Sequence, residues 1–181
     1  MTALRILAIC LCIPLALAAG SLAYSHLRPL AITAETELDA TPAEVWAVLA
    51  DNSAYSAWHP SIIDSSGTIA VGQRLHNTVI FGDETMTFRP KVLAAEPERE
   101  LTWIGHTWMP GLADGRHSFH LEPLPDGGTR LTQTEVFAGA AVPWAAGMLS
   151  EMEAEFGAVN TAVDARAAAL RTEGALEAGD G

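Results

Sequence analysis

The fold is decided by residues 143–170, which read PWAAGMLSEMEAEFGAVNTAVDARAAAL. Apolar residues recur in this stretch at spacings of three and four, which indicates a helix with one continuous apolar face. Pro143 suits the first turn of a helix, and acidic residues in the first half with arginines toward the end match the helix dipole. A helix this long needs a broad partner surface. The residues of the apolar face are Trp144, Met148, Met152, Phe156, Val159, Val163, Ala167 and Leu170.

The preceding part of the chain predicts the sheet that supplies this surface. Residues 31–40 alternate in polarity, as a half-buried strand does. Thr41 and Glu44 form a capping box with Pro42 at the first helical position, so a short helix is expected up to about residue 51. A second helical turn is expected at residues 55–60. Turns rich in glycine and proline then separate six runs that suit strands, at residues 62–71, 73–81, 84–95, 100–108, 116–124 and 129–137.

This order of elements predicts an α+β fold. A curved antiparallel sheet of about seven strands would wrap around the long C-terminal helix, with two short helices after the first strand. We expect this domain to cover residues 31–171 and residues 172–181 to form a flexible polar tail.

Several strings in this order resemble the START-like helix-grip superfamily, and within it the SRPBCC or polyketide cyclase/dehydrase-like family. The resemblance covers about residues 32–170 and implies a cavity between sheet and helix that holds a lipid, a sterol, a polyketide or another apolar ligand. It also implies that only some members are enzymes. The strings are TPAEVWAVLAD at 41–51, YSAWHP at 55–60, PERELTW at 97–103, DGRHSF at 114–119, GTRLTQTE at 128–135 and EFGAVN at 155–160.

Residues 1–30 form an apolar N-terminal segment without charge between Ile6 and Ser25, which is long enough to cross a membrane. Two interpretations stay open. The segment is either a signal peptide cleaved after Ala18 or an uncleaved membrane anchor. Both predict a domain that is secreted or membrane-anchored outside the cytoplasm, with anchorage facing the cytoplasm as the alternative.

Charge and cysteine content exclude several classes of function. All 22 acidic residues follow residue 30, whereas Arg5 and Arg28 precede it, so residues 31–181 carry a net charge of −14. Such an acidic domain repels nucleic acid. Cys10 and Cys12 are the only cysteines and lie in the N-terminal segment, so the domain has no thiol nucleophile or cysteine metal ligand. We predict no cofactor.

The strongest candidate for chemistry is a histidine–glutamate pair on the last hairpin. If Leu121 pairs with Leu131, then His117 lies opposite Glu135 on the face that points inward. A slip of two residues would instead place Phe119 opposite Glu135. An inward pair of this kind can bind a ligand carbonyl or hydroxyl group, act as acid and base, or simply be a structural polar pair.

We also expect a set of neighbouring side chains to bind the ligand. They are Trp58, Trp103, His117, Phe119, Gln133, Glu135, Met148, Met152 and Phe156. His59 is expected on a surface loop, with a position in the pocket as the alternative. His117 and His120 fall on opposite faces of one strand, so we predict no metal site.

The function predicted is therefore binding of a hydrophobic small molecule. The alternative is a polyketide cyclase or dehydratase that uses His117 and Glu135 as acid and base. A third hypothesis, an interaction module with a filled interior, would require the absence of a cavity of about 300 Å³.

Overall fold

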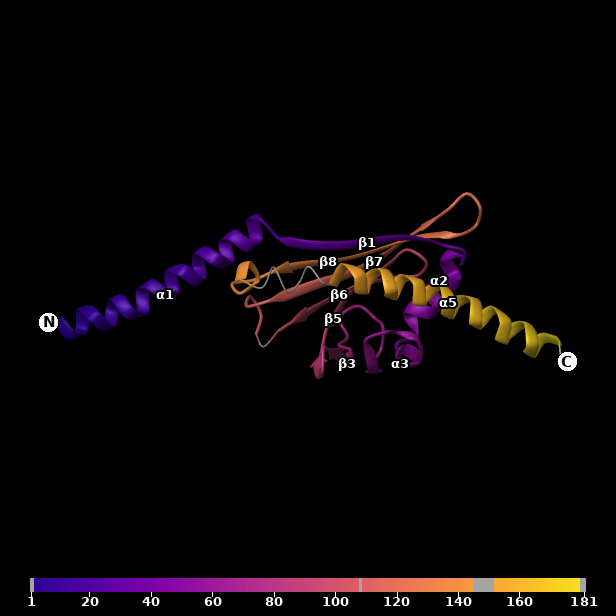
Figure 1. Ribbon diagram of the computed structural model, residues 1–181, viewed down its shortest axis with the longest axis horizontal. Helices are drawn as coiled ribbons and strands as arrows, with labels where there is room; N and C mark the ends of the chain where they lie inside the picture. The colour runs from indigo at the N-terminus through magenta and orange to yellow at the C-terminus, as the bar shows by residue number, and fades with distance from the viewer. Residues whose placement is uncertain (1, 108, 145–151, 180–181) are drawn as a thin grey trace.

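The computed structural model describes residues 2–107, 109–144 and 152–179, and it has an N-terminal helix, an α+β body and a long C-terminal helix (Figure 1). The predicted element order is confirmed. The elements are α1 Thr2–Leu27, β1 Leu30–Leu38, α2 Pro42–Ala50, a 3₁₀ turn at Asn52–Ala54, α3 Tyr55–Trp58, β2 Ile62–Ser66, β3 His76–Phe81, β4 Glu84–Phe88, β5 Lys91–Glu96, β6 Glu100–His106, β7 Asp114–Pro123, β8 Thr129–Ala138 and α5 Met152–Gly179.

The strands form two antiparallel sheets. The larger sheet has the order β1-β8-β7-β6-β5, and the smaller one has the order β2-β3-β4. A single bridge between Arg74 and Lys91 connects the two sheets. Helix α5 lies across the larger sheet (Figure 1), which is the packing predicted from its apolar face.

Two predicted strand boundaries were wrong. The stretch at 84–95 is two strands, because Pro90 has no N–H group to donate to a ladder, and this raises the strand number to eight. The stretch at 62–71 ends at Ser66. Gly67 follows with a φ of +109° and sits against the carbonyl of Arg74, where a side chain would not fit.

The capping box at the start of α2 is confirmed. The Thr41 hydroxyl accepts from the backbone N–H of Glu44, and the Glu44 carboxylate accepts from the backbone N–H of Thr41 at 2.8 Å. This backbone hydrogen bond lowers the pKa of Glu44, with a smaller contribution from Arg171. Since Arg171 donates to Glu44 at 3.2 Å, the cap also connects α2 to α5.

The main core lies between α2, the larger sheet and the middle of α5. Val45, Leu49, Leu101, Leu131 and Val163 are fully buried there. The apolar face of α5 is confirmed at Phe156, Val159, Val163 and Ala167, all of which are buried. Trp144 was wrongly assigned to that face, because its side chain is 85% exposed, and Met148 lies outside the described residues.

The ends of the chain differ from their predictions in one respect. Helix α5 continues to Gly179, beyond the predicted end at residue 170, although residues 171–175 are exposed as a polar tail would be. At the other end, Cys10–Leu27 of α1 is long and apolar enough to cross a membrane. The last turns of α1 contact the body. Ser21 donates to the Ala140 carbonyl at 2.6 Å, and Ser25 accepts from the Gly139 N–H at 2.9 Å.

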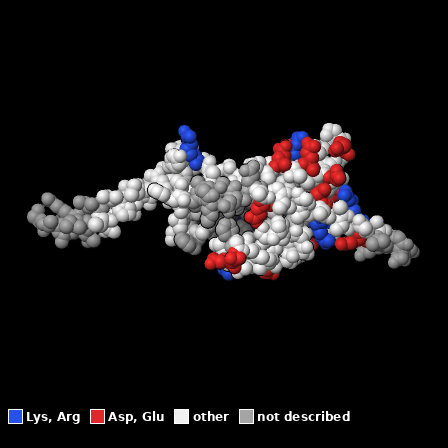
Figure 2. All heavy atoms as spheres, viewed as in Figure 1, with Lys and Arg blue, Asp and Glu red and all other residues white. Residues whose placement is uncertain are grey.

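On the face shown in Figure 2, acidic side chains gather at the end of the molecule that carries the C-terminal helix. Three carboxylates surround Arg130, since those of Glu35, Glu37 and Glu122 all lie within 3.7 Å of its guanidinium.

Candidate ligand-binding site

The site begins with the register of the β7–β8 hairpin. Leu121 pairs with Leu131, Phe119 with Gln133, and His117 with Glu135. The predicted register is therefore confirmed, and the alternative slip of two residues is wrong. Since side chains alternate along a strand, this register places His117, Phe119, Gln133 and Glu135 on the face toward α5.

These side chains line a cavity of about 350 Å³ between the two sheets and the first turns of α5. Its volume exceeds the lower limit of about 300 Å³ that is usual for ligand pockets, so the hypothesis of a filled interior loses its support. The apolar part of the lining consists of Ile62, Val79, Met86, Phe88, Pro90, Trp103, Ala113, Phe119, Phe137, Val142, Met152, Phe156 and Val159.

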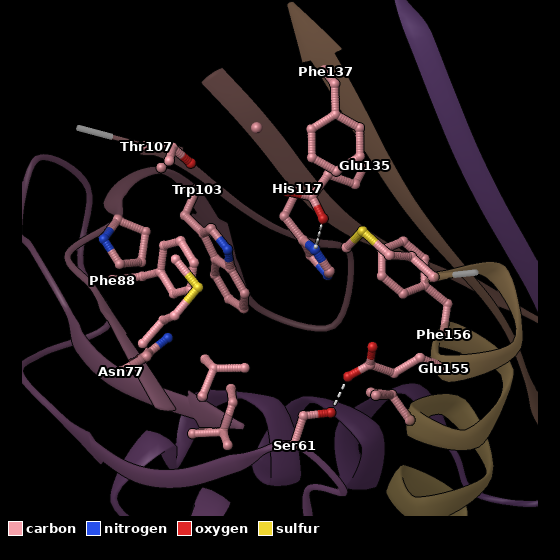
Figure 3. A pocket seen from close by; sticks show the side chains of 18 of the residues that line it. Ser61, Asn77, Phe88, Trp103, Thr107, His117, Glu135, Phe137, Glu155 and Phe156 are labelled. Carbon is pink, nitrogen blue, oxygen red and sulfur yellow. Dashed lines mark hydrogen bonds and ion pairs between the residues drawn. The ribbon is translucent and has the colours of Figure 1, made fainter. Parts of the chain in front are cut away.

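His117 is held in the middle of this lining (Figure 3). Its ring stacks on Trp103, with centroids 5.1 Å apart and an angle of 12°, and Phe156 meets it edge-on at 5.2 Å. The His117 Nδ1 atom lies 3.4 Å from a Glu135 carboxylate oxygen, and the Nε2 atom lies 3.1 Å from the Gln133 amide nitrogen. Because an amide nitrogen donates, Nε2 accepts and the proton of a neutral ring sits on Nδ1, facing Glu135.

Two observations bear on the chemistry of His117, Glu135 and the neighbouring Gln133. The His117 and Glu135 side chains are only 12% and 16% exposed. The carbonyl oxygen of the Gln133 side chain is buried, and no hydrogen-bond donor for it lies among the described residues. A buried acceptor without a partner costs free energy, which a ligand hydroxyl group would offset.

Gly115 provides the space that the Glu135 carboxylate occupies. A Cβ atom built on Gly115 would collide with the Glu135 Oε1 atom. The absence of a side chain at this position therefore allows Glu135 to turn toward His117.

A second polar group lies on the opposite side of the cavity, between α3, β2 and α5. Ser61 donates to the carboxylate of Glu155 (Figure 3). The His59 Nδ1 atom accepts from the backbone N–H groups of Ser61 and Ile62, both at 3.1 Å. Burial lowers the pKa of His59 to about 4, with a smaller effect from the nearby His117, so His59 is neutral near pH 7.

The structure brings most of the predicted ligand-binding residues together. Trp103, His117, Phe119, Gln133, Glu135, Met152 and Phe156 all line the cavity. Trp58 is not among the lining residues, because its ring packs on Tyr55 at 5.2 Å and on the main core. Its neighbour His59 lines the cavity instead, so the prediction of a surface loop for His59 was wrong.

Sequence reasoning also missed Glu155, which was interpreted only as a residue that favours the helix dipole. A signal was present. Glu155 lies three residues after Met152 and four before Val159, so all three share one side of α5. A carboxylate at the border of an apolar helix face can point into a cavity as well as into solvent.

The other histidines belong to separate surroundings. His106 contacts Asp114 at 2.8 Å at the edge of the cavity, whereas His120 pairs with Glu100 and points away from it. Across residues 2–107, 109–144 and 152–179 there is no cluster of three His, Cys, Asp or Glu side chains suited to a metal ion.

Comparisons with known proteins agree with this architecture. A family model described as polyketide cyclase / dehydrase and lipid transport matches residues 29–174. No significant match was found among proteins of curated function.

Several solved structures are similar to this chain. The Zhui aromatase/cyclase from Streptomyces sp. R1128 has a TM-score of 0.65 and 20% identity, over 77% of this chain and 94% of that chain. Ara h 8.0201 has a TM-score of 0.62 and 13% identity, over 78% and 99%. The di-domain ARO/CYC StfQ from the steffimycin biosynthetic pathway has a TM-score of 0.67 and 12% identity, over 80% and 52%. At these identities the likeness shows a shared fold.

Proposed function

The chain belongs to the polyketide cyclase/dehydrase and lipid transport family of the START-like helix-grip superfamily, and from this premise we propose that it binds a hydrophobic small molecule between its larger sheet and α5. One observation carries the proposal. The cavity of about 350 Å³ has mostly apolar walls and a few fixed polar side chains, which is the usual construction of a ligand pocket.

We further propose that α1 anchors the domain to a membrane, outside the cytoplasm. The length and composition of Cys10–Leu27 support this. The hydrogen bonds of Ser21 and Ser25 attach α1 to residues 139–140, close to Val142 in the cavity wall. A pocket held near the bilayer surface is well placed to take up a ligand that partitions into lipid.

Gly105 offers a direct test of the cavity. It lines the cavity, and a Cβ atom built there meets no atom within 4 Å. Gly105→Leu should therefore fill the cavity without a clash, and Gly105→Ala is the matched control of smaller volume. Energy transfer from tryptophan, which includes Trp103 in the cavity lining, to N-phenyl-1-naphthylamine, an uncharged apolar dye, would report binding to the full chain in detergent. We expect binding to fall from wild type to Gly105→Ala and to be lost in Gly105→Leu, whereas equal binding by all three chains would contradict the proposal.

A second function, a cyclase or dehydratase, is favoured by the pairing of His117 with Glu135 beside Gln133. In such an enzyme His117 Nε2 would take a proton from the carbon next to a ligand carbonyl, in place of the hydrogen bond that it accepts from Gln133. Protonation of a departing hydroxyl group by the same pair would complete the loss of water.

This alternative makes a separate prediction. His117→Gln should abolish turnover of a β-hydroxyketone while the affinity for the dye remains within about twofold. Turnover that survives in the variant would refute a catalytic role for the pair.

A further inference from the structure

The cavity wall formed by α3, β2 and β3 carries two hydrogen-bond donors whose orientation is fixed. The first is His59. Its Nδ1 atom accepts from two backbone N–H groups, so the proton of the neutral ring must sit on Nε2. His59 lines the cavity, and among the described residues its ring makes hydrogen bonds only through Nδ1.

The second donor is Asn77, which is only 4% exposed. Its amide orientation follows from a chain of hydrogen bonds. The Asn52 side-chain nitrogen donates to the Ser65 hydroxyl at 3.2 Å, and this hydroxyl donates to the Asn77 side-chain oxygen at 2.9 Å. The Asn77 nitrogen therefore remains for another partner, and Figure 3 shows it turned toward the interior of the cavity. Within the described chain the Asn77 side chain makes a hydrogen bond only through its oxygen.

The charges around the cavity restrict the ligand further. The lining contains the carboxyl groups of Glu135 and Glu155 but no lysine or arginine among the described residues. A ligand carboxylate or phosphate would enter without a cationic partner and next to two acidic groups, which costs free energy in a cavity of low polarity. A neutral carbonyl oxygen would accept from both donors at no such cost.

We propose that His59 and Asn77 form a recognition site for an uncharged carbonyl oxygen, so that the ligand is a neutral, carbonyl-bearing hydrophobic molecule and not a free fatty acid. This inference rests on the proposed binding function and specifies its ligand class. It assigns the oxygen-bearing end of the ligand to the wall opposite His117.

Three probes of equal chain length test the inference on the full chain in detergent. They are 2-tridecanone, tridecanoic acid and tridecane, each measured by displacement of N-phenyl-1-naphthylamine at about pH 8, where the acid is ionised. We expect the ketone to bind about tenfold tighter than the alkane, because it gains the two hydrogen bonds. We expect the acid to bind more weakly than the ketone.

Variants of His59 and Asn77 then test whether these two donors cause the preference for the ketone. His59→Phe and Asn77→Leu should each lower the ratio of ketone affinity to alkane affinity about fivefold. Ser65→Ala is the matched positioning variant, because it frees the Asn77 amide to rotate, and it should reduce ketone affinity by a smaller factor. The Gly105→Leu chain, in which the cavity is filled, measures the dye signal that comes from detergent alone.

The outcomes separate this inference from the function on which it rests. Equal affinity for the ketone and the alkane, or tighter binding of the acid than of the ketone, would overturn the recognition site. The proposal of a ligand-binding cavity would still stand if the dye bound. If the dye did not bind the wild-type chain at all, both proposals would fall together. The comparison of the three probes on the wild-type chain decides the matter even where a variant fails to fold.

Discussion

The two halves of helix α5 have the same sequence pattern but different surroundings. Val163 and Ala167, in its middle, pack against α2 and the larger sheet in the main core. Met152 and Phe156, in its first turns, cover the cavity instead. The apolar face continues across both. An apolar helix face thus shows which residues leave solvent, but the residues opposite determine whether the space beneath is filled.

Side-chain truncation should show this contrast most strongly. Leu131→Ala, on β8 in the main core beneath the middle of α5, should lower the free energy of unfolding by about 3 kcal/mol, because it removes a fully buried side chain and leaves a void. Met152→Ala should cost about 1 kcal/mol, since its side chain already faces empty space. Chemical denaturation of both variants measures the difference. Equal losses of stability in the two variants would mean that the main core and the cavity region beneath α5 are packed alike.

The cavity half should respond to acid through His59. Its pKa is lowered from 6.5 to about 4 in the folded chain, so the unfolded chain takes up the proton first as the pH falls. The stability present above pH 6.5 should therefore decline between pH 6.5 and about 4, by roughly 3 kcal/mol. Denaturation curves for wild type and His59→Gln across this range isolate the effect. The same pH dependence in both chains would show that His59 is not responsible.

On the side of the main core, the start of α2 is stabilised by the capping hydrogen bonds of Thr41 and Glu44. Thr41→Ala removes the hydroxyl that accepts from Glu44 N–H and should lower stability by about 1 kcal/mol. Dye binding should remain unchanged, because the cap is not part of the cavity lining. A loss of dye affinity in this variant would indicate that the two halves are coupled more closely than their contacts suggest.

The smallest expected effect on stability is at Gly115, which lies in the cavity lining. Gly115→Ala should displace the Glu135 carboxylate from His117 and change stability by less than about 1 kcal/mol. The His117 ring resonances in an NMR pH titration would report the displacement. Unchanged resonances would show that Glu135 does not depend on the space at Gly115.

Sequence reasoning was most successful where local rules act. The capping box at Thr41 follows from hydrogen bonds within one turn. The pairing of His117 with Glu135 follows from the alternation that Leu121 and Leu131 impose on a hairpin. Both depend on residues that are close in sequence, and the resemblance to the helix-grip superfamily supplied the arrangement of the remaining elements.

It was less successful where distant segments meet. Glu155 reaches the cavity because Ser61, 94 positions earlier, donates a hydrogen bond to its carboxylate. His59 lines the cavity because its ring accepts from the backbone that follows it, whereas Trp58 packs against Tyr55. The separate smaller sheet depends on Pro90, which was not recognised as the end of a strand. The contact between Glu155 and Ser61 cannot be read from a local pattern, whereas the errors at His59, Trp58 and Pro90 concern neighbouring residues whose effect was misjudged.

The central claim is that the cavity under the first turns of α5 holds a neutral hydrophobic ligand. Native mass spectrometry of the full chain, purified in detergent from its own host without refolding, tests this most directly. We predict a discrete added mass that disappears on solvent extraction and is absent from Gly105→Leu. An added mass equally present on Gly105→Leu, or a bare chain under every growth condition, would contradict the claim.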